Sequence, residues 1–358
     1  MTVIIKENEQ ITKLLNEWYQ EIRQRNAIKA KRLKEEIDEQ IYEMKEDQNL
    51  LLYYALLDFR YKLLIDELSI TSKSFHEIDS FNTPTDHYLA YYYHLFKGIH
   101  ATIIANYKEA QYHFDEAEIL LQNVPDELEK ADFHYRVSTF YYHTYQPLLA
   151  IKYASKAKKI FSKHFGYEKH IALCNNILGL SAVYLKQFIV AEKHFRSAIS
   201  YLQKKNDKEL ALFIRHNLAW LYASQNLPKL AIRELTDVVQ IPNYFRAIFL
   251  KAREHFKLGE VNLTKDLIEK GLNICHHLQN EEYTHHFSIL QKRNNHSPLD
   301  TLEKTILRAI SYFEKEGLFH YVEEYAEILA LACYKEKNDK KSSKYFHLAY
   351  QARGKKLH

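Results

Sequence analysis

A lone glutamine between a charged segment and an aromatic-rich segment is the residue of this chain best placed to do chemistry. Gln48 follows Glu46 and Asp47, to which we assign supporting roles. An amide both donates and accepts hydrogen bonds, so it can orient a water molecule for attack on a bond. Either Asp47 or Asn49 can cap the helix that follows, which would fix Gln48 at an exposed, rigid corner.

The helix predicted after Gln48 carries a row of apolar and aromatic groups at helical spacings. Such a row beside an exposed amide suits a protein surface better than a small-molecule pocket. We predict that a protein partner docks on this row together with two later aromatic residues, which have an alternative interpretation as core of the first repeat. The predicted docking residues are Leu51, Leu52, Tyr54, Phe59, Tyr92 and Phe96.

The composition indicates an all-α protein. Only seven Gly and six Pro occur in 358 residues, which favours helices joined by short turns. The length indicates two domains or a repeat array. Because no N-terminal signal and no long apolar run occurs, we expect a cytoplasmic protein with no membrane segment. The three cysteines are odd in number, so we expect free thiols in a reducing compartment.

Charge and motif patterns disfavour several classes of function. Residues 1–70 contain 11 Lys or Arg against 14 Asp or Glu, and this acidic balance repels phosphate backbones. No glycine precedes Gly98, which also disfavours a DNA-binding helix-turn-helix. Neither of the glycine motifs that bind nucleotides, Gly-x-x-x-x-Gly-Lys and Gly-x-Gly-x-x-Gly, occurs in the sequence. His276 and His277 lie near His285 and His286, but adjacent helical residues point apart, so we predict no metal site.

Two structural parts are expected. Helical periodicity predicts helices over residues 8–24, 27–45 and 48–68, whose apolar stripes can be buried only against one another. We therefore predict a three-helix bundle over residues 1–70. A segment rich in Ser, Thr, Asn and Asp follows, and we predict an interdomain linker over residues 71–87.

Residues 88–358 carry the small-residue pattern of tetratricopeptide repeats. The alanines at the most regular position recur every 40 or 41 residues and are Ala110, Ala150, Ala191 and Ala231. We predict about seven helix pairs that form a right-handed superhelix, with the last pair as its cap. Asn217 falls on the concave side, where its amide either binds the backbone of an extended peptide or is simply a surface group.

Several longer words of the sequence point to one family. They are Leu-Asn-Glu-Trp-Tyr at 15–19, Glu-Asp-Gln-x-Leu-x-Leu-Tyr-Tyr at 46–54, Asp-Phe-Arg at 58–60, Tyr-Tyr-Tyr-His-Leu-Phe-Lys-Gly at 91–98 and Glu-Lys-Ala-Asp-Phe at 129–133. With the bundle, the linker and the long-period repeats, they make the whole chain similar to the Rap family. These proteins are the response-regulator aspartate phosphatases of Bacillus-type bacteria and their phages.

The resemblance implies that the bundle binds a response regulator protein and that a short, re-imported signalling peptide inhibits it from the repeat groove. Gln48 would enter the active site of the regulator, which supplies Mg²⁺, so the chain needs no cofactor of its own. The implied peptide-binding residues are Asn217, Arg136, Ser181 and Tyr184. In the family, bound peptide draws the bundle onto the repeats. Ser181 and Tyr184 replace an expected Asn and Asp and the linker is short, which indicates a different peptide or weak sensitivity.

Two hypotheses from different classes follow. In the first, the chain is an enzyme that hydrolyses the aspartyl phosphate of a response regulator. In the second, it is a non-catalytic interaction protein that sequesters a DNA-binding regulator, under peptide control. Family members that sequester can carry the same glutamine, so Gln48 is compatible with both. A plain tetratricopeptide scaffold would leave residues 46–60 unexplained.

Overall fold

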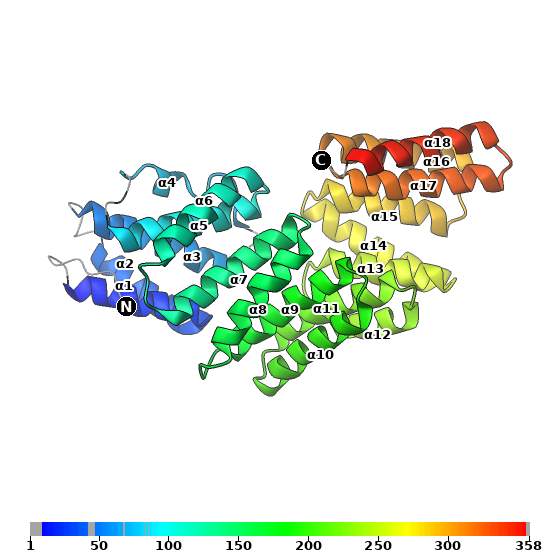
Figure 1. Cartoon of the computed structure of the whole chain (residues 1–358). Helices are drawn as coiled ribbons and strands as arrows, with labels where there is room; N and C mark the ends of the chain where they lie inside the picture. The colour runs from blue at the N-terminus through cyan, green and yellow to red at the C-terminus, as the bar shows by residue number, and fades with distance from the viewer. Residues whose placement is uncertain (1–8, 42–46, 67–68, 83, 85, 356–358) are drawn as a thin grey trace. The chain divides into compact units, whose positions relative to one another are not determined.

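The computed structural model describes residues 9–41, 47–66, 69–82, 84 and 86–355. Throughout these residues the regular secondary structure consists of helices, eighteen in all, joined by short turns (Figure 1). The predicted all-α fold class is therefore confirmed. Single residues in left-handed conformation commonly follow the helix ends, as at Asn206 (φ 55°) and Asn226 (φ 57°), because this conformation satisfies the last carbonyl groups and reverses the chain.

The N-terminal bundle contains the three predicted helices, α1 (Glu9–Arg23), α2 (Ala27–Ile41) and α3 (Gln48–Ile65). Helices α1 and α3 end somewhat earlier than predicted, and the predicted end of the second helix, at 45, lies outside the described residues. The stripe on α1 is buried through Leu15, Trp18 and Ile22. Helix α3 buries residues on most of its circumference, since it packs against α1 and α2 and also against the first repeat.

The segment predicted as a linker is packed against its neighbours. It contains a short helix, α4 (His76–Asp79), and a fully buried phenylalanine, Phe75. The ring of Phe75 lies 5.1 Å from that of Phe59 in an edge-to-face arrangement and 5.4 Å from His100, measured between ring centroids. Lys97 forms an ion pair with Asp79. Through Phe75, this segment therefore belongs to the hydrophobic core, although it was predicted to be a linker between two domains.

The fourteen remaining helices follow one another as seven helix pairs. They are α5 (His87–Ile103) with α6 (Tyr107–Leu121), α7 (Glu127–His143) with α8 (Pro147–Phe161), α9 (Glu168–Tyr184) with α10 (Phe188–Lys204), α11 (Lys208–Ser224) with α12 (Pro228–Val238), α13 (Phe245–Lys257) with α14 (Val261–His277), α15 (Glu281–Asn294) with α16 (Leu299–Lys315), and α17 (Phe319–Lys335) with α18 (Asp339–Lys355).

Small residues let the repeat helices approach closely. The four periodic alanines are completely buried. Gly271 of α14 shows the constraint most sharply, because a Cβ atom added there would lie 2.1 Å from Cζ of Phe287 on α15. No side chain can occupy that space unless the phenylalanine ring moves.

We expect Gly271→Ala to lower the free energy of unfolding by about 1–2 kcal/mol. The added methyl group overpacks the contact with Phe287, and this destabilisation exceeds the gain from the higher helix propensity of alanine. Gly354→Ala is the matched control, since nothing lies within 4 Å of the added Cβ of Gly354. It should leave stability unchanged or raise it slightly. Urea unfolding followed by circular dichroism measures both, and an equally stable Gly271→Ala protein would contradict the close approach.

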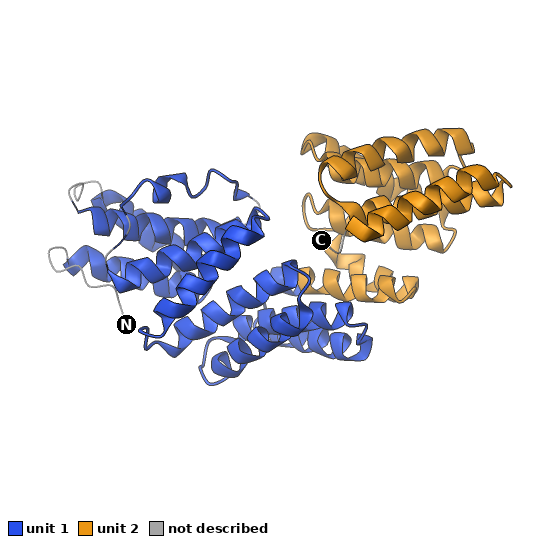
Figure 2. Ribbon diagram, turned by 45° about the horizontal axis from the view of Figure 1, so that its top comes forward, with its two compact units in different colours: residues 1–211 blue, residues 212–358 orange. Residues whose placement is uncertain are grey.

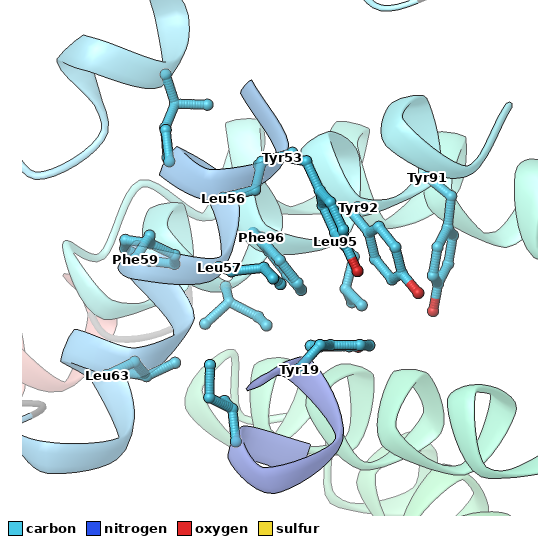
Figure 3. Close-up of a cluster of buried hydrophobic side chains, with 14 of the residues drawn as sticks. Tyr19, Tyr53, Leu56, Leu57, Phe59, Leu63, Tyr91, Tyr92, Leu95 and Phe96 are labelled. Carbon is cyan, nitrogen blue, oxygen red and sulfur yellow. The ribbon is translucent and has the colours of Figure 1, made fainter. Parts of the chain in front are cut away.

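The structure divides into two compact units, residues 1–211 and 212–358, and the division falls within α11 (Figure 2). The predicted boundary at 71–87 does not separate the units, because the bundle and the first repeats share one hydrophobic core. In this core, Tyr19 of α1 faces Tyr92 and Phe96 of α5, beside Tyr53 of α3 (Figure 3). The core of the first unit therefore spans the two predicted domains.

Candidate functional site

Gln48 is the first residue of α3 and is exposed. Asp47 caps the helix, since its Oδ1 accepts a hydrogen bond from the backbone N–H of Leu50 at 3.0 Å. Of the two predicted caps, Asp47 is thus confirmed and Asn49 lies inside the helix. Glu46 lies outside the described residues. The amide of Gln48 therefore stands on a defined helix start, as the sequence predicts.

Polar contacts hold α3 against the other two bundle helices. The hydroxyl of Tyr53 donates to Oδ1 of Asn16 on α1 at 2.9 Å. On the other side, Tyr54 donates to Asp38 at 2.5 Å and accepts from Nζ of Lys34 at 2.9 Å, both on α2. Burial and the hydrogen bond to Asp38 raise the pKa of Tyr54 to about 12, so this phenol stays protonated. These contacts give Gln48 a rigid base.

We expect Asp47→Ala to cost about 1 kcal/mol, because it removes the side-chain acceptor for the first turn of α3. Asn49→Ala is the matched control, because it removes an exposed polar side chain two residues further along the chain. Thermal unfolding of the two variants measures the difference. Equal destabilisation by both changes would show that the side chain of Asp47 does not stabilise the first turn of α3.

Four of the six residues predicted to dock a partner are buried in the core of the protein. Leu52, Phe59, Tyr92 and Phe96 are 2%, 2%, 4% and 0% exposed, because they point into the core between α1, α3 and α5. The alternative interpretation, that the aromatic residues of α5 are core of the first repeat, is the one that the structure supports. Leu51 and Tyr54 are half-buried. Of the predicted row, these two remain within reach of a partner in this conformation.

A buried ionic cluster joins the bundle to the second repeat. Nη1 of Arg23, at the end of α1, lies 2.8 Å from Asp126 and 3.0 Å from Glu129 of the repeat. The hydroxyl of Tyr19 donates to Glu129 at 2.7 Å. Burial raises the pKa of Glu129, against the opposing charge of Arg23. His170 of the third repeat bonds the backbone oxygen of Arg23 through Nε2 at 2.8 Å.

A second ion pair lies beside it. Nη2 of Arg60 on α3 is 3.0 Å from Oδ2 of Asp132 on α7, and both side chains are 3% exposed. Arg136 approaches the other carboxylate oxygen at 3.5 Å. Burial alone would raise the pKa of Asp132, but the Arg60 and Arg136 guanidinium groups hold it below its ordinary value. The bundle is therefore fastened to the repeats by charges that lie away from water.

The contacts of this cluster were not predicted, although Arg60, Glu129 and Asp132 lie in the segments that resemble the family. Two signals were available. Arg60 falls in line with Leu56 and Leu63 of α3, at spacings of four and three residues, and Glu129 and Asp132 are three residues apart on one helix face. Buried charges require partners, so an arginine in line with leucines on a helix predicts a carboxylate elsewhere in the chain.

The four predicted peptide-binding residues are differently placed. Ser181 is completely buried, with no hydrogen-bond partner for its hydroxyl among the described residues, so it presents nothing to a peptide in this conformation. The ring of Tyr184 lies 5.4 Å from those of Tyr142 and Tyr145. Arg136 belongs to the buried cluster. The fourth, Asn217, lies in the second compact unit.

Asn217 is half-buried and hydrogen-bonds the side chain of His216. Burial lowers the pKa of His216 to about 4, against the effect of this hydrogen bond, so the imidazole is neutral at pH 7. Asn217 therefore has a partner within the protein, and its contact with a peptide backbone stays a prediction.

The described residues hold neither a metal-binding cluster nor a membrane-spanning helix. Nowhere in that part of the chain do three or more His, Cys, Asp or Glu side chains come together in a way that could hold a metal ion. None of the helices described there is both long and apolar enough to cross a membrane.

Comparisons with known proteins point to one group. Residues 5–66 match the family model of response regulator aspartate phosphatase H, N terminal. Regulatory protein RapG of Bacillus subtilis (strain 168) is 30% identical over 70% of this chain and 70% of its own length. Regulatory protein RapF of the same strain is 28% identical over 99% and 96%. The crystal structure of a Rap protein complexed with competence and sporulation factor superposes with a TM-score of 0.83 at 23% identity, covering 97% of this chain and 98% of that one.

Proposed function

Because the chain belongs to the Rap family of regulators, we propose that it binds a response regulator through its bundle and hydrolyses the regulator's aspartyl phosphate. The observation that carries this proposal is the presentation of Gln48, an exposed amide on the capped first turn of α3. The matched family model covers the whole bundle and bears the name of a response regulator aspartate phosphatase.

Gln48 would act by positioning. An aspartyl phosphate is labile, so an amide that holds a water in line with the phosphorus accelerates its hydrolysis without serving as an acid or a base. The Mg²⁺ ion that neutralises the phosphoryl oxygens would come from the regulator. The contacts of α3 with Asn16, Lys34 and Asp38 limit the movement of the helix that carries the Gln48 amide. This reduces the entropic cost of placing the amide in its reactive geometry.

Peptide control belongs to the same proposal. A similar structure holds competence and sporulation factor, which supports a short peptide as a ligand of this chain as well. Arg136, Tyr184 and Asn217 are the remaining candidates for its contacts, since Ser181 is buried. The aromatic cluster of Tyr142, Tyr145 and Tyr184 favours a peptide with an apolar or aromatic side chain at that position.

The second candidate is sequestration of a DNA-binding regulator. The names of RapF and RapG are compatible with it, because both are called regulatory proteins and neither name states an enzymatic activity. In this case the bundle would occupy the surface with which the regulator reads DNA, and Gln48 would be dispensable.

The test uses a panel of response regulators phosphorylated with labelled phosphate. Incubation with the purified full chain should release label from one regulator far faster than the regulator loses it alone. Band-shift assays with the same regulators test the second candidate, which predicts release of DNA while the label stays on the protein. If no regulator in the panel binds, loses its label or leaves its DNA, both candidates are wrong.

A further inference from the structure

A small cavity lies where the bundle meets the second and third repeats. Its volume is about 20 Å³, which is room for one water-sized group. It is lined from four segments of the first compact unit, and its lining includes Arg23, Arg25, Arg60, Asp132, Arg136 and His170. Four of these side chains are arginines and one is a carboxylate. Of these lining residues, the proposed function uses Arg136 alone, as a candidate contact of the peptide.

The charge of the lining is mainly positive. Arg23 finds its carboxylates outside the lining, at Asp126 and Glu129. Within the lining, Asp132 is shared between Arg60 and Arg136. Two guanidinium groups beside one carboxylate leave a positive potential in a place where burial makes it strong.

Arg60 has hydrogen-bond donors to spare. Its side chain is 3% exposed, and only Nη2 reaches Asp132. Nε and Nη1 are buried without a partner among the described residues, as is Nε of Arg23. One face of the Arg60 guanidinium lies over the ring of Phe96, at 5.1 Å from the centroid, which satisfies the charge in part but not the N–H groups. A buried donor left unpaired destabilises the folded protein, because it has lost its bonds to water.

From these contacts we infer that the cavity is a binding site for a small inorganic anion of halide size, held by Arg60 and Arg136. An anion accepts from every donor around it and has no hydrogens of its own to place. A water would accept from two donors and would need acceptors for its two hydrogens. Such an anion touches α3 of the bundle and α7 of the repeat together, so its binding stabilises the packing of one on the other.

The affinity is measurable by thermal unfolding of the full chain without peptide. Chloride replaces gluconate at constant ionic strength, so that general screening is unchanged. The melting temperature should rise in a saturable way, by about 3–6 °C when chloride reaches ten times its dissociation constant. Arg136→Gln should abolish the rise. A wild-type protein that melts at the same temperature in both salts overturns the inference.

A matched control separates this site from general effects of charge removal. Arg215 also pairs with two carboxylates, Glu234 and Asp237, in the second compact unit. Arg215→Gln should keep the full chloride response. If it loses the response as Arg136→Gln does, or if Arg136→Gln keeps it, the anion does not bind in this cavity.

Bromide soaked into crystals of the full chain distinguishes an anion from a water at the same place. Bromide scatters anomalously and water does not. We expect an anomalous peak within hydrogen-bonding distance of Arg60. A water peak without anomalous signal, at a bromide concentration that saturates the thermal response of the same protein, would overturn the inference.

Discussion

Asp132→Ala is expected to destabilise the first compact unit by about 3–5 kcal/mol. The change leaves the Arg60 guanidinium buried without its carboxylate, because the side chain is 3% exposed and cannot turn to water. Arg136 loses the same partner. The loss therefore comes from an uncompensated buried charge more than from the ion pair itself.

Urea unfolding measures this effect, and two controls define its cause. Asp237→Ala removes a carboxylate that also pairs with an arginine but is 65% exposed, so it should cost less than about 1 kcal/mol. The double change Arg60→Met with Asp132→Leu removes both charges, and most of the stability should return. If the double variant is no more stable than Asp132→Ala, the buried charge is not the reason for the loss.

The effect has a defined dependence on pH. The pKa of Asp132 lies below its ordinary value of 3.8 in the folded protein, because Arg60 and Arg136 outweigh the effect of burial. Its contribution to stability is therefore fully present above pH 3.8 and is lost as the pH falls through the lower, folded-state pKa. The difference between wild type and Asp132→Ala should be constant near neutral pH and shrink only in acid.

Local features of the fold could be predicted from the sequence because each depends on residues close along the chain. Asp47 caps α3 through a hydrogen bond to a residue three positions away. The alanine at 191 marks a repeat because helix pairs approach closely only at small residues. These signals are short in range, so a single sequence carries them.

The docking row could not be placed in the same way. Spacing correctly put Leu52 and Phe59 on α3, but it does not say what covers each face of a helix. Phe75, from the presumed linker, covers Phe59, and Tyr19 covers Tyr92. The contact between Arg60 and Asp132 joins residues 72 positions apart. Such burial is a property of the tertiary fold and leaves only an indirect mark on the sequence.

Gln48→Ala is expected to slow dephosphorylation of a response regulator by about 10²-fold, the typical cost of losing a group that positions a reactant. Binding should change little, because Gln48 is one exposed side chain at the start of α3. The measurement is the release of labelled phosphate from the regulator, together with the affinity of the chain for that regulator.

Two further variants test whether the rate of dephosphorylation depends on the exact position of the Gln48 amide. Gln48→Asn keeps the amide but withdraws it by one methylene, and a shift of that size should cost nearly as much as its removal. Asn49→Ala removes the neighbouring exposed amide and should leave the rate unchanged. If Gln48→Ala dephosphorylates as fast as wild type, the amide does not position the water. If neither the wild type nor Gln48→Ala releases label, while both displace the regulator from DNA, the chain acts by sequestration and Gln48 is dispensable.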